Sequence, residues 1–264
     1  MVDARTKIVG ILNITPDSFS DGGKFNSLNS ALNHLKEMLD AGADMIDIGA
    51  ESTRPNAKPI SANEEWQRLE KILPAIILEV KKYPKVQTSI DSYHFEVIKK
   101  SYELGIDIIN DVSGLIDENI IKFIAEKNIT TVLMHNLAIH ANPDLIINQH
   151  LDINNEIITW AQQKISYLTK KGVRKSQLIF DPGIGFAKDA KQSIRILKNI
   201  DSYRVLEAPL YIGHSKKSFL DSLNIEGNRT EKTLEVSKFL IEKKVDFLRV
   251  HDVLEHRKLL TIPN

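Results

Sequence analysis

Short apolar segments alternate with longer amphipathic ones along almost the whole chain, and this alternation limits the fold more than any other feature. Eight of the short segments are rich in Ile, Val or Leu and are bounded by polar residues, glycine or proline. This pattern is typical of strands buried in a parallel sheet. The predicted strands are Lys7–Asn13, Met45–Gly49, Val86–Asp91, Ile106–Asp111, Thr130–His135, Leu178–Asp181, Leu210–Gly213 and Phe247–His251.

The stretches between these strands are predicted helices. In Ser27–Ala41 leucines recur every three or four residues, and the pattern stops at Gly42. A capping box opens a second helix, Ser61–Lys82, in which we expect a kink at Pro74. The remaining predicted helices are Tyr93–Leu104, Asp117–Lys127, Leu151–Lys171 and Thr230–Lys244.

Eight strands that alternate with helices over about 250 residues match the number and length of a (β/α)8 TIM barrel. A doubly wound open sheet is the alternative, since periodicity alone does not separate the two α/β folds. The chain has no Pro/Ser-rich linker, low-complexity tract or repeat of 20–50 residues. We therefore expect residues 1–264 to form one domain.

Composition excludes several classes of function. The 35 Lys and Arg residues balance the 35 Asp and Glu residues, which argues against a partner that is nucleic acid or a membrane surface. The absence of cysteine excludes disulfides, a thiolate nucleophile and a Cys-ligated metal. No apolar run approaches the ~18 residues of a membrane span, and the N-terminal segment lacks the apolar core of a signal peptide. A cytoplasmic location is therefore expected.

Polar residues follow every predicted strand. In a parallel barrel the eight carboxyl ends share one rim, where barrel enzymes place their active sites. The sequence therefore predicts a site at this rim. The polar segments in question are Asn13 with Thr15–Gly23, Glu51–Pro55, Asp91, Asn110–Asp111, Met134–His135, Asp181–Phe186, Gly213–Ser218 and Arg249–His251.

The residue types at the rim indicate the chemistry of its ligand. Arg249 and His251 are two residues apart and therefore leave the strand on one face, which favours an anionic group. The Gly213–Ser218 turn offers backbone N–H groups, hydroxyls and two lysines, which also suit an anion. Three other strand ends supply acceptors for N–H donors, namely Asp91, Asn110 and Asp181. Together they favour a heterocycle that carries a phosphate-type leaving group.

Two long motifs identify a family resemblance. Gly10–Gly23 and Asp47–Pro55 resemble the first and second signatures of the dihydropteroate synthases. Shorter motifs follow in the family's order, and the resemblance runs from about residue 7 to residue 252. These are Ser89–Ser92, Ile109–Val112, Asp181–Phe186, Ser215–Ser218 and Arg249–Asp252.

The resemblance implies a (β/α)8 transferase of folate synthesis. Such an enzyme joins p-aminobenzoate to 6-hydroxymethyl-7,8-dihydropterin diphosphate, and it releases diphosphate and 7,8-dihydropteroate. It further implies Mg2+ as cofactor, sulfonamides as inhibitors that imitate aminobenzoate, and a homodimer formed through outer helices. An electron-rich dihydropterin can share developing positive charge, so a dissociative, SN1-like substitution is the hypothesis for the mechanism.

The resemblance also assigns roles to residues. The metal ligand is matched to Asn13. The pterin and diphosphate site is matched to Thr53, Asp91, Asn110, Met134, Asp181, Phe186, Gly213, Lys217, Arg249 and His251. Of these, the residues expected to act in catalysis are Asp91, Lys217, Arg249 and His251. The aminobenzoate site is matched to Phe19, Thr53, Arg54, Pro55 and Ser218.

Two other functions are open at this point. A pterin-binding methyltransferase shares the barrel and the pterin-holding Asp and Asn, but it has no diphosphate to expel. A degenerate paralogue would bind pterin without catalysis. The long first motif, Ser52–Pro55 and Ser215–Ser218 argue against both. The segment Asn136–Pro143 lacks the family's usual turn, and His135, His140 and His150 fit no zinc motif.

Overall fold

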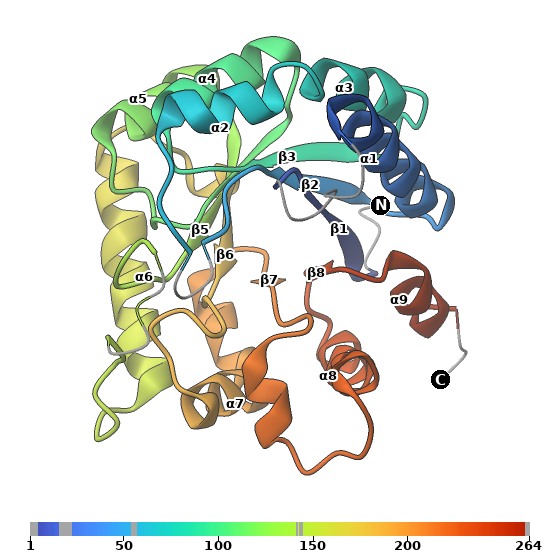
Figure 1. The fold of residues 1–264 in the computed structure, drawn as a ribbon. Coiled ribbons are helices and arrows are strands. Elements are labelled where there is room, and N and C mark those ends of the chain that lie inside the picture. The colour runs from blue at the N-terminus through green and yellow to red at the C-terminus, as the bar shows by residue number, and fades with distance from the viewer. Residues whose placement is uncertain (1–4, 16–22, 54–56, 141, 143–144, 262–264) are drawn as a thin grey trace.

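The computed structural model describes residues 5–15, 23–53, 57–140, 142 and 145–261. Its sheet has eight parallel strands in the order β6-β5-β4-β3-β2-β1-β8-β7. A parallel bridge between Phe180 and Leu210 joins the two ends, so the sheet closes into a barrel (Figure 1). The strands are β1 (Lys7–Asn13), β2 (Met45–Gly49), β3 (Gln87–Asp91), β4 (Ile108–Asp111), β5 (Thr130–Met134), β6 (Leu178–Asp181), β7 (Tyr211–Ile212) and β8 (Phe247–Val250).

This strand order confirms the predicted (β/α)8 TIM barrel and excludes the open sheet. Strands that follow one another in the chain are neighbours all around the barrel, without the reversal of order that an open, doubly wound sheet requires. Helices surround the barrel (Figure 1). They are α1 (Gly23–Asp40), α2 (Ala62–Leu69), α3 (Leu73–Val80), α4 (Phe95–Leu104), α5 (Glu118–Lys127), α6 (Ile153–Lys170), α7 (Ala190–Lys198), α8 (Arg229–Glu242) and α9 (Val253–Leu259).

The predicted helix Ser61–Lys82 is wrong in one respect, because the structure has two helices where one kinked helix was expected. Ser61 caps α2 as predicted, and its side chain accepts a hydrogen bond from the Glu64 N–H. Pro74 lies in the first turn of α3. Proline has no N–H to donate and its ring clashes with the preceding turn, so it is tolerated at a helix start and breaks a helix interior. The prediction also lacked α7 and α9.

The barrel strands bury both faces. Their outward side chains pack under the helices in a large apolar core, as Ile8, Ile46 and Leu248 do. Their inward side chains form a separate apolar floor inside the barrel. The floor consists of Val9, Met45, Ile108, Val132, Ile179, Tyr211 and Phe247. A polar side chain two residues further toward the carboxyl end of a strand points to the same face and therefore lies above this floor.

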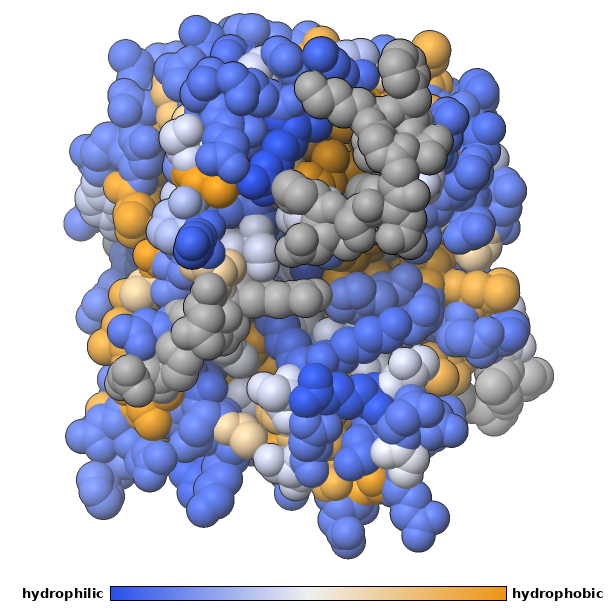
Figure 2. All heavy atoms as spheres, viewed as in Figure 1, coloured by the Kyte–Doolittle hydropathy of each residue, from blue (hydrophilic) through white to orange (hydrophobic). Residues whose placement is uncertain are grey.

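The register fixes which polar residues these are. Asn13 pairs with Gly49, Gly49 with Asp91, and Asp91 with Asn110. Residues in register across a parallel sheet point to the same face, so these positions share the barrel interior. On the face shown in Figure 2, hydrophilic residues predominate, with smaller hydrophobic patches between them. None of the described helices is long and apolar enough to cross a bilayer.

Candidate active site

Arg249 lies between two carboxylates inside the barrel. Its Nε donates to Asp47 Oδ2 at 2.6 Å and its Nη2 donates to Asp91 Oδ2 at 2.8 Å. Asn110 Nδ2 donates to the same Asp47 oxygen at 3.0 Å. Four strands thus meet in one hydrogen-bonded group, and Asp47 at its centre is fully buried. The guanidinium is held in one orientation before any ligand arrives.

The charges in this group follow from burial and pairing. Burial opposes the charge of Arg249, but Asp47 and Asp91 outweigh it and hold the pKa of the guanidinium above its ordinary value. Burial raises the pKa of Asp91 to about 7, although the charge of Arg249 opposes this rise. Arg249 is therefore a permanent cation, whereas the charge of Asp91 responds to whatever binds beside it.

Asp181 lies on the far side of the barrel interior from β2 and β3. It is 6% exposed, and its Oδ1 accepts a hydrogen bond of 2.7 Å from the Gly183 N–H. Burial raises the pKa of Asp181, and the charge of Lys217 opposes the rise. A Cβ at Gly213 would lie 4.0 Å from Asp181 Oδ2 and 3.8 Å from Arg249 Cδ. Gly213 thus lies between these two side chains, within van der Waals distance of both.

Lys217 enters the same space from the turn after β7. Its ammonium donates to the carbonyl oxygen of Ile184 and lies 4.5 Å from the centre of the Phe186 ring. Burial lowers the pKa of Lys217 to about 8. The neighbouring Lys216 is exposed and pairs with Asp252 at 2.9 Å. Of the two predicted lysines in this motif, only Lys217 belongs to the site.

His251 is oriented by a serine from the neighbouring turn. Its Nδ1 lies 2.9 Å from Ser215 Oγ, and its backbone N–H donates to the same oxygen at 3.3 Å. One contact holds the ring and the other holds its backbone, so Ser215 anchors His251 just after β8. The predicted proximity of the Gly213–Ser218 turn to Arg249 and His251 is therefore found in the structure.

The other predicted residues fall around this centre. Met134 is 3% exposed and in register with Asp181, so its side chain lies beside that carboxylate on the same face of the sheet. Asn13 and Thr53 are half-buried at the ends of β1 and β2, and Ser218 is exposed at the start of a 3-10 helix, Ser218–Ser222. The predicted aminobenzoate residues Phe19, Arg54 and Pro55 lie outside the described residues.

The sequence reading missed a buried lysine beneath the site. Lys188 Nζ donates to the Phe186 carbonyl oxygen at 2.7 Å and lies 2.9 Å from His135 Nδ1. Burial lowers the pKa of Lys188 to about 7, and burial together with Lys188 lowers the pKa of His135 to about 2. Neutral His135 can therefore accept from the amine. The lysine ties the segment after β5 to the segment after β6.

Tyr211 was also missed as a neighbour of the site. It is 1% exposed on the barrel floor, and among the described groups its hydroxyl has no hydrogen-bond partner. Burial, followed by the charge of Asp47, raises its pKa well above the ordinary value. The alternation that places Arg249 and His251 on one face would equally have placed Tyr211 below Gly213.

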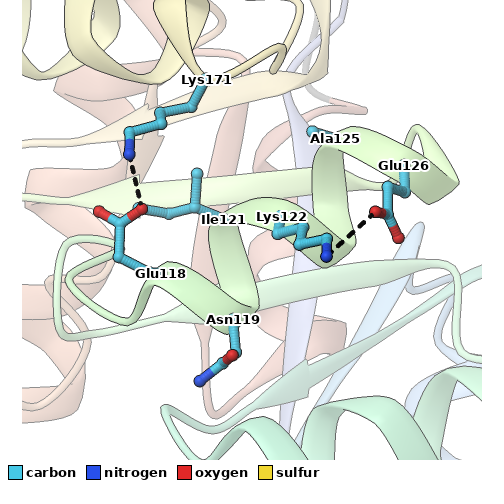
Figure 3. A pocket seen from close by; sticks show the side chains of 7 residues that line it. All are labelled: Glu118, Asn119, Ile121, Lys122, Ala125, Glu126 and Lys171. Atoms are coloured by element: carbon cyan, nitrogen blue, oxygen red, sulfur yellow. Dashed lines mark ion pairs between the residues drawn. The ribbon is translucent and has the colours of Figure 1, made fainter.

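A depression lies on the outer surface at α5 (Figure 3). It is crossed by two surface ion pairs, Lys171–Glu118 at 3.0 Å and Lys122–Glu126 at 3.9 Å. Exposed pairs of this kind are weak and mobile, and they offer no fixed set of groups to a ligand. We therefore assign the ligand site to the rim.

The rim of this barrel combines Asp91, Asn110, Asp181 and Lys217. Comparison of the sequence with known families gives the class of protein: residues 9–251 match the family described as pterin binding enzyme. A dihydropteroate synthase of Clostridium beijerinckii is 38% identical over 97% of this chain and 93% of its own. A dihydropteroate synthase of Anaplasma phagocytophilum, solved with 6-hydroxymethylpterin-monophosphate, superposes with a TM-score of 0.87 at 36% identity, covering 97% of both chains. The enzyme of Yersinia pestis, solved with a sulfonamide drug, gives 0.87 at 33% identity, covering 98% of this chain and 94% of its own. The chain belongs to the dihydropteroate synthase family.

Proposed function

We propose that this protein condenses p-aminobenzoate with the dihydropterin diphosphate to give 7,8-dihydropteroate and diphosphate. The observation that carries the proposal is that Asp181 and Arg249 lie on either side of Gly213, so that the carboxylate and the guanidinium border the same space at the rim. One side of this space presents a carboxylate for N–H donors, and the other presents a fixed cation for an anion. A heterocycle with a charged leaving group matches both sides.

The pterin ring would lie on the Asp181 side. Asp181 Oδ1 accepts from Gly183 and keeps a second lone pair, so the two carboxylate oxygens can accept as a pair from a ring amino group and the adjacent ring N–H. Asn110 and Asp91 approach from β4 and β3, and Lys217 approaches over the Phe186 ring. Binding an N–H-rich ring would favour the ionised form of Asp181, whose pKa burial raises.

The diphosphate would lie toward Arg249 and His251, with Mg2+ held by Asn13. Asn13 suits such a site because Mg2+ that arrives with a phosphate ester needs only one or two protein oxygens. Asn13 is half-buried at the rim, in register with Gly49 beside Asp91. When bound, Mg2+ would supply positive charge that stabilises the diphosphate leaving group.

The difficult step is cleavage of the C–O bond at the pterin methylene. The leaving diphosphate takes the bonding electron pair, and Arg249 and His251 stabilise its charge. The methylene carbon, with its positive charge shared by the dihydropterin ring, then accepts the lone pair of the aminobenzoate nitrogen. That nitrogen afterwards loses a proton to water. A secondary isotope effect near unity at the methylene hydrogens would contradict this dissociative order.

Diphosphate release tests the proposal directly. Purified protein with Mg2+ and the pterin diphosphate should form dihydropteroate and diphosphate in equal amounts, and only when p-aminobenzoate is present. Asp181→Asn should lose most of this activity, by about 100-fold or more, because an amide presents one donor where the ring requires an acceptor pair. Lys216→Ala, at an exposed surface pair, is the matched control and should retain activity. Pterin binding without product would instead favour the non-catalytic paralogue.

We propose in addition that sulfonamides compete with p-aminobenzoate, and that the protein forms a homodimer through its outer helices. The dimer is proposed from the family resemblance, and the large apolar side chains that the outer elements expose, such as Leu78, Leu104 and Leu254, belong to different helices. Light scattering should then give a mass of twice 29.9 kDa. The cytoplasmic location stays a prediction.

A further inference from the structure

The carboxylate of Glu51 is the meeting point of three segments that are far apart in the chain. Glu51 lies two residues after the end of β2, and its side chain is 4% exposed. Its Oε1 accepts from the Ile60 N–H at 3.1 Å, from the Tyr93 hydroxyl at 3.0 Å and from His140 Nε2 at 2.8 Å. Its Oε2 lies 3.3 Å from His94 Nε2. We call these five residues the Glu51 cluster.

Glu51 is ionised in this setting. Burial alone would raise its pKa, but the contacts with His94, Ile60, Tyr93 and His140 outweigh burial and lower it. A second carboxyl, Glu65 of α2, lies beside the cluster and accepts from Ser92 Oγ at 2.9 Å. The cluster therefore has one carboxylate that several donors share, with Glu65 adjacent.

A metal ion is one way to read this group, because Glu51, Glu65 and His94 place ligand atoms within 4.8 Å of one another. The geometry of His94 argues against it. His94 Nε2 lies 3.2 Å from the Ile60 carbonyl oxygen, which can only accept a hydrogen bond. Nε2 therefore carries a hydrogen and has no lone pair to offer a metal. The group is a hydrogen-bonded clamp.

The clamp fixes the segment that leaves β2. The Ile60 N–H bond joins the two ends of residues 51–60, and Arg68 of α2 donates to the Ala50 carbonyl oxygen at 2.8 Å just before Glu51. His140 reaches the same carboxylate from the segment after β5, 89 residues further along the chain. Thr53 lies two residues beyond this anchored carboxylate.

We propose that His140 is a positioning residue for the aminobenzoate side of the site. By donating to Glu51 it holds the end of β2, and with it Thr53, in the geometry that receives aminobenzoate. This inference rests on the proposed function. His140 itself is 10% exposed and acts through Glu51 rather than through the ligand.

Steady-state kinetics test this role. His140→Ala should raise the KM for p-aminobenzoate by about tenfold, as expected when a hydrogen bond to a charged group is lost. The KM for the pterin diphosphate and the melting temperature should change little. His140→Gln should restore the KM, because its amide N–H2 can take the place of Nε2–H. His150→Ala, an exposed histidine further along the same segment, is the matched control. An unchanged KM in His140→Ala, or equal rises in both KM values, would overturn the proposal.

Hydrogen exchange of the ligand-free protein provides a readout that does not depend on activity. The Ile60 amide should exchange faster in His140→Ala than in the wild type and in His140→Gln. Faster exchange in a protein that makes no dihydropteroate would support the clamp and reject the proposed function. Unchanged exchange would reject the clamp whatever the activity. If His140→Ala fails to fold, His140→Asn replaces it, since its shorter amide stops short of Glu51.

Discussion

Asp91 and Lys217 are two side chains of the site whose charge changes near neutral pH. Burial raises the pKa of Asp91 to about 7 and lowers the pKa of Lys217 to about 8. Each shift disfavours the charged form, as expected where water is excluded. A ligand that brings N–H donors to Asp91 and negative charge to Lys217 would restore both charges. The apo site is therefore adjusted to a ligand that carries both features.

Lys217 gives a prediction for the pH dependence of catalysis. A lysine whose pKa is lowered keeps its charge below that pKa, so the free enzyme loses this cation as the pH rises through about 8. The value of kcat/KM for the pterin diphosphate should therefore fall on the alkaline side with a midpoint near 8. Lys217→Arg should move that midpoint upward, because a guanidinium stays protonated.

Profiles of kcat/KM at saturating aminobenzoate would measure this limb. Lys216→Ala, which alters only an exposed pair, should leave the midpoint in place. An alkaline limb that stays the same in Lys217→Arg would assign it to another group.

Among the elements, α8 has the most completely defined start. Asn228 Oδ1 accepts from the Thr230 and Glu231 N–H groups at 2.8 and 3.2 Å, and Glu231 Oε2 accepts from the Asn228 N–H at 2.7 Å. This reciprocal capping box satisfies N–H groups that a helix start leaves unpaired. Because α8 directly precedes β8, this helix leads into the strand end that carries Arg249 and His251.

Asn228→Ala should lower the free energy of unfolding by about 1 kcal/mol, the usual cost of removing such a cap. For a chain of this size that corresponds to a fall of roughly 2–4 °C in the melting temperature. Asn228→Asp keeps an acceptor oxygen and should retain most of the stability. Thermal denaturation of the three proteins checks this, and an unchanged melting temperature in Asn228→Ala would show that the cap contributes nothing.

For the whole molecule, the weakest part of the barrel is the closure between β6 and β7. The two strands share one bridge, Phe180–Leu210, supported by the Phe180 N–H bond of 2.8 Å to the Pro209 carbonyl oxygen. By contrast, β1 and β2 pair over five positions, from Val9–Met45 to Asn13–Gly49. Opening the barrel between β6 and β7 would therefore break fewer hydrogen bonds than opening it between β1 and β2.

Hydrogen exchange should therefore be faster at Phe180 and Ile212, beside the seam, than at Ile46 and Ile48 in β2. Bound pterin diphosphate should slow exchange at the seam, because Asp181 lies on one side of it and Lys217 and Arg249 lie on the other. Amide exchange with and without this ligand measures both effects. Uniform protection around the barrel would contradict the idea of a weak seam.

Much of the fold follows from local sequence. Each β-strand was found within two residues of its predicted bounds, because a buried strand needs a short apolar run and polar or glycine ends, and both can be read in a short window. The rim position of Asp91, Asn110, Asp181 and Arg249 follows from the same strands and the two-residue alternation. The family motifs indicate which family the chain belongs to, and they leave these predicted positions unchanged.

Other features depend on contacts between distant segments. Closure at Phe180–Leu210, the burial of Lys188 beside His135, and the Glu51–His140 bond each join residues that no local pattern relates. The residues next to a lysine or histidine in the sequence do not show whether its side chain is exposed to solvent or buried inside a barrel. The groups that surround the side chain belong to segments that are remote in the sequence. The eight strands and their order along the chain were therefore available from the sequence itself. The paired charges and the clamp exist because the barrel closes and brings the strand ends together.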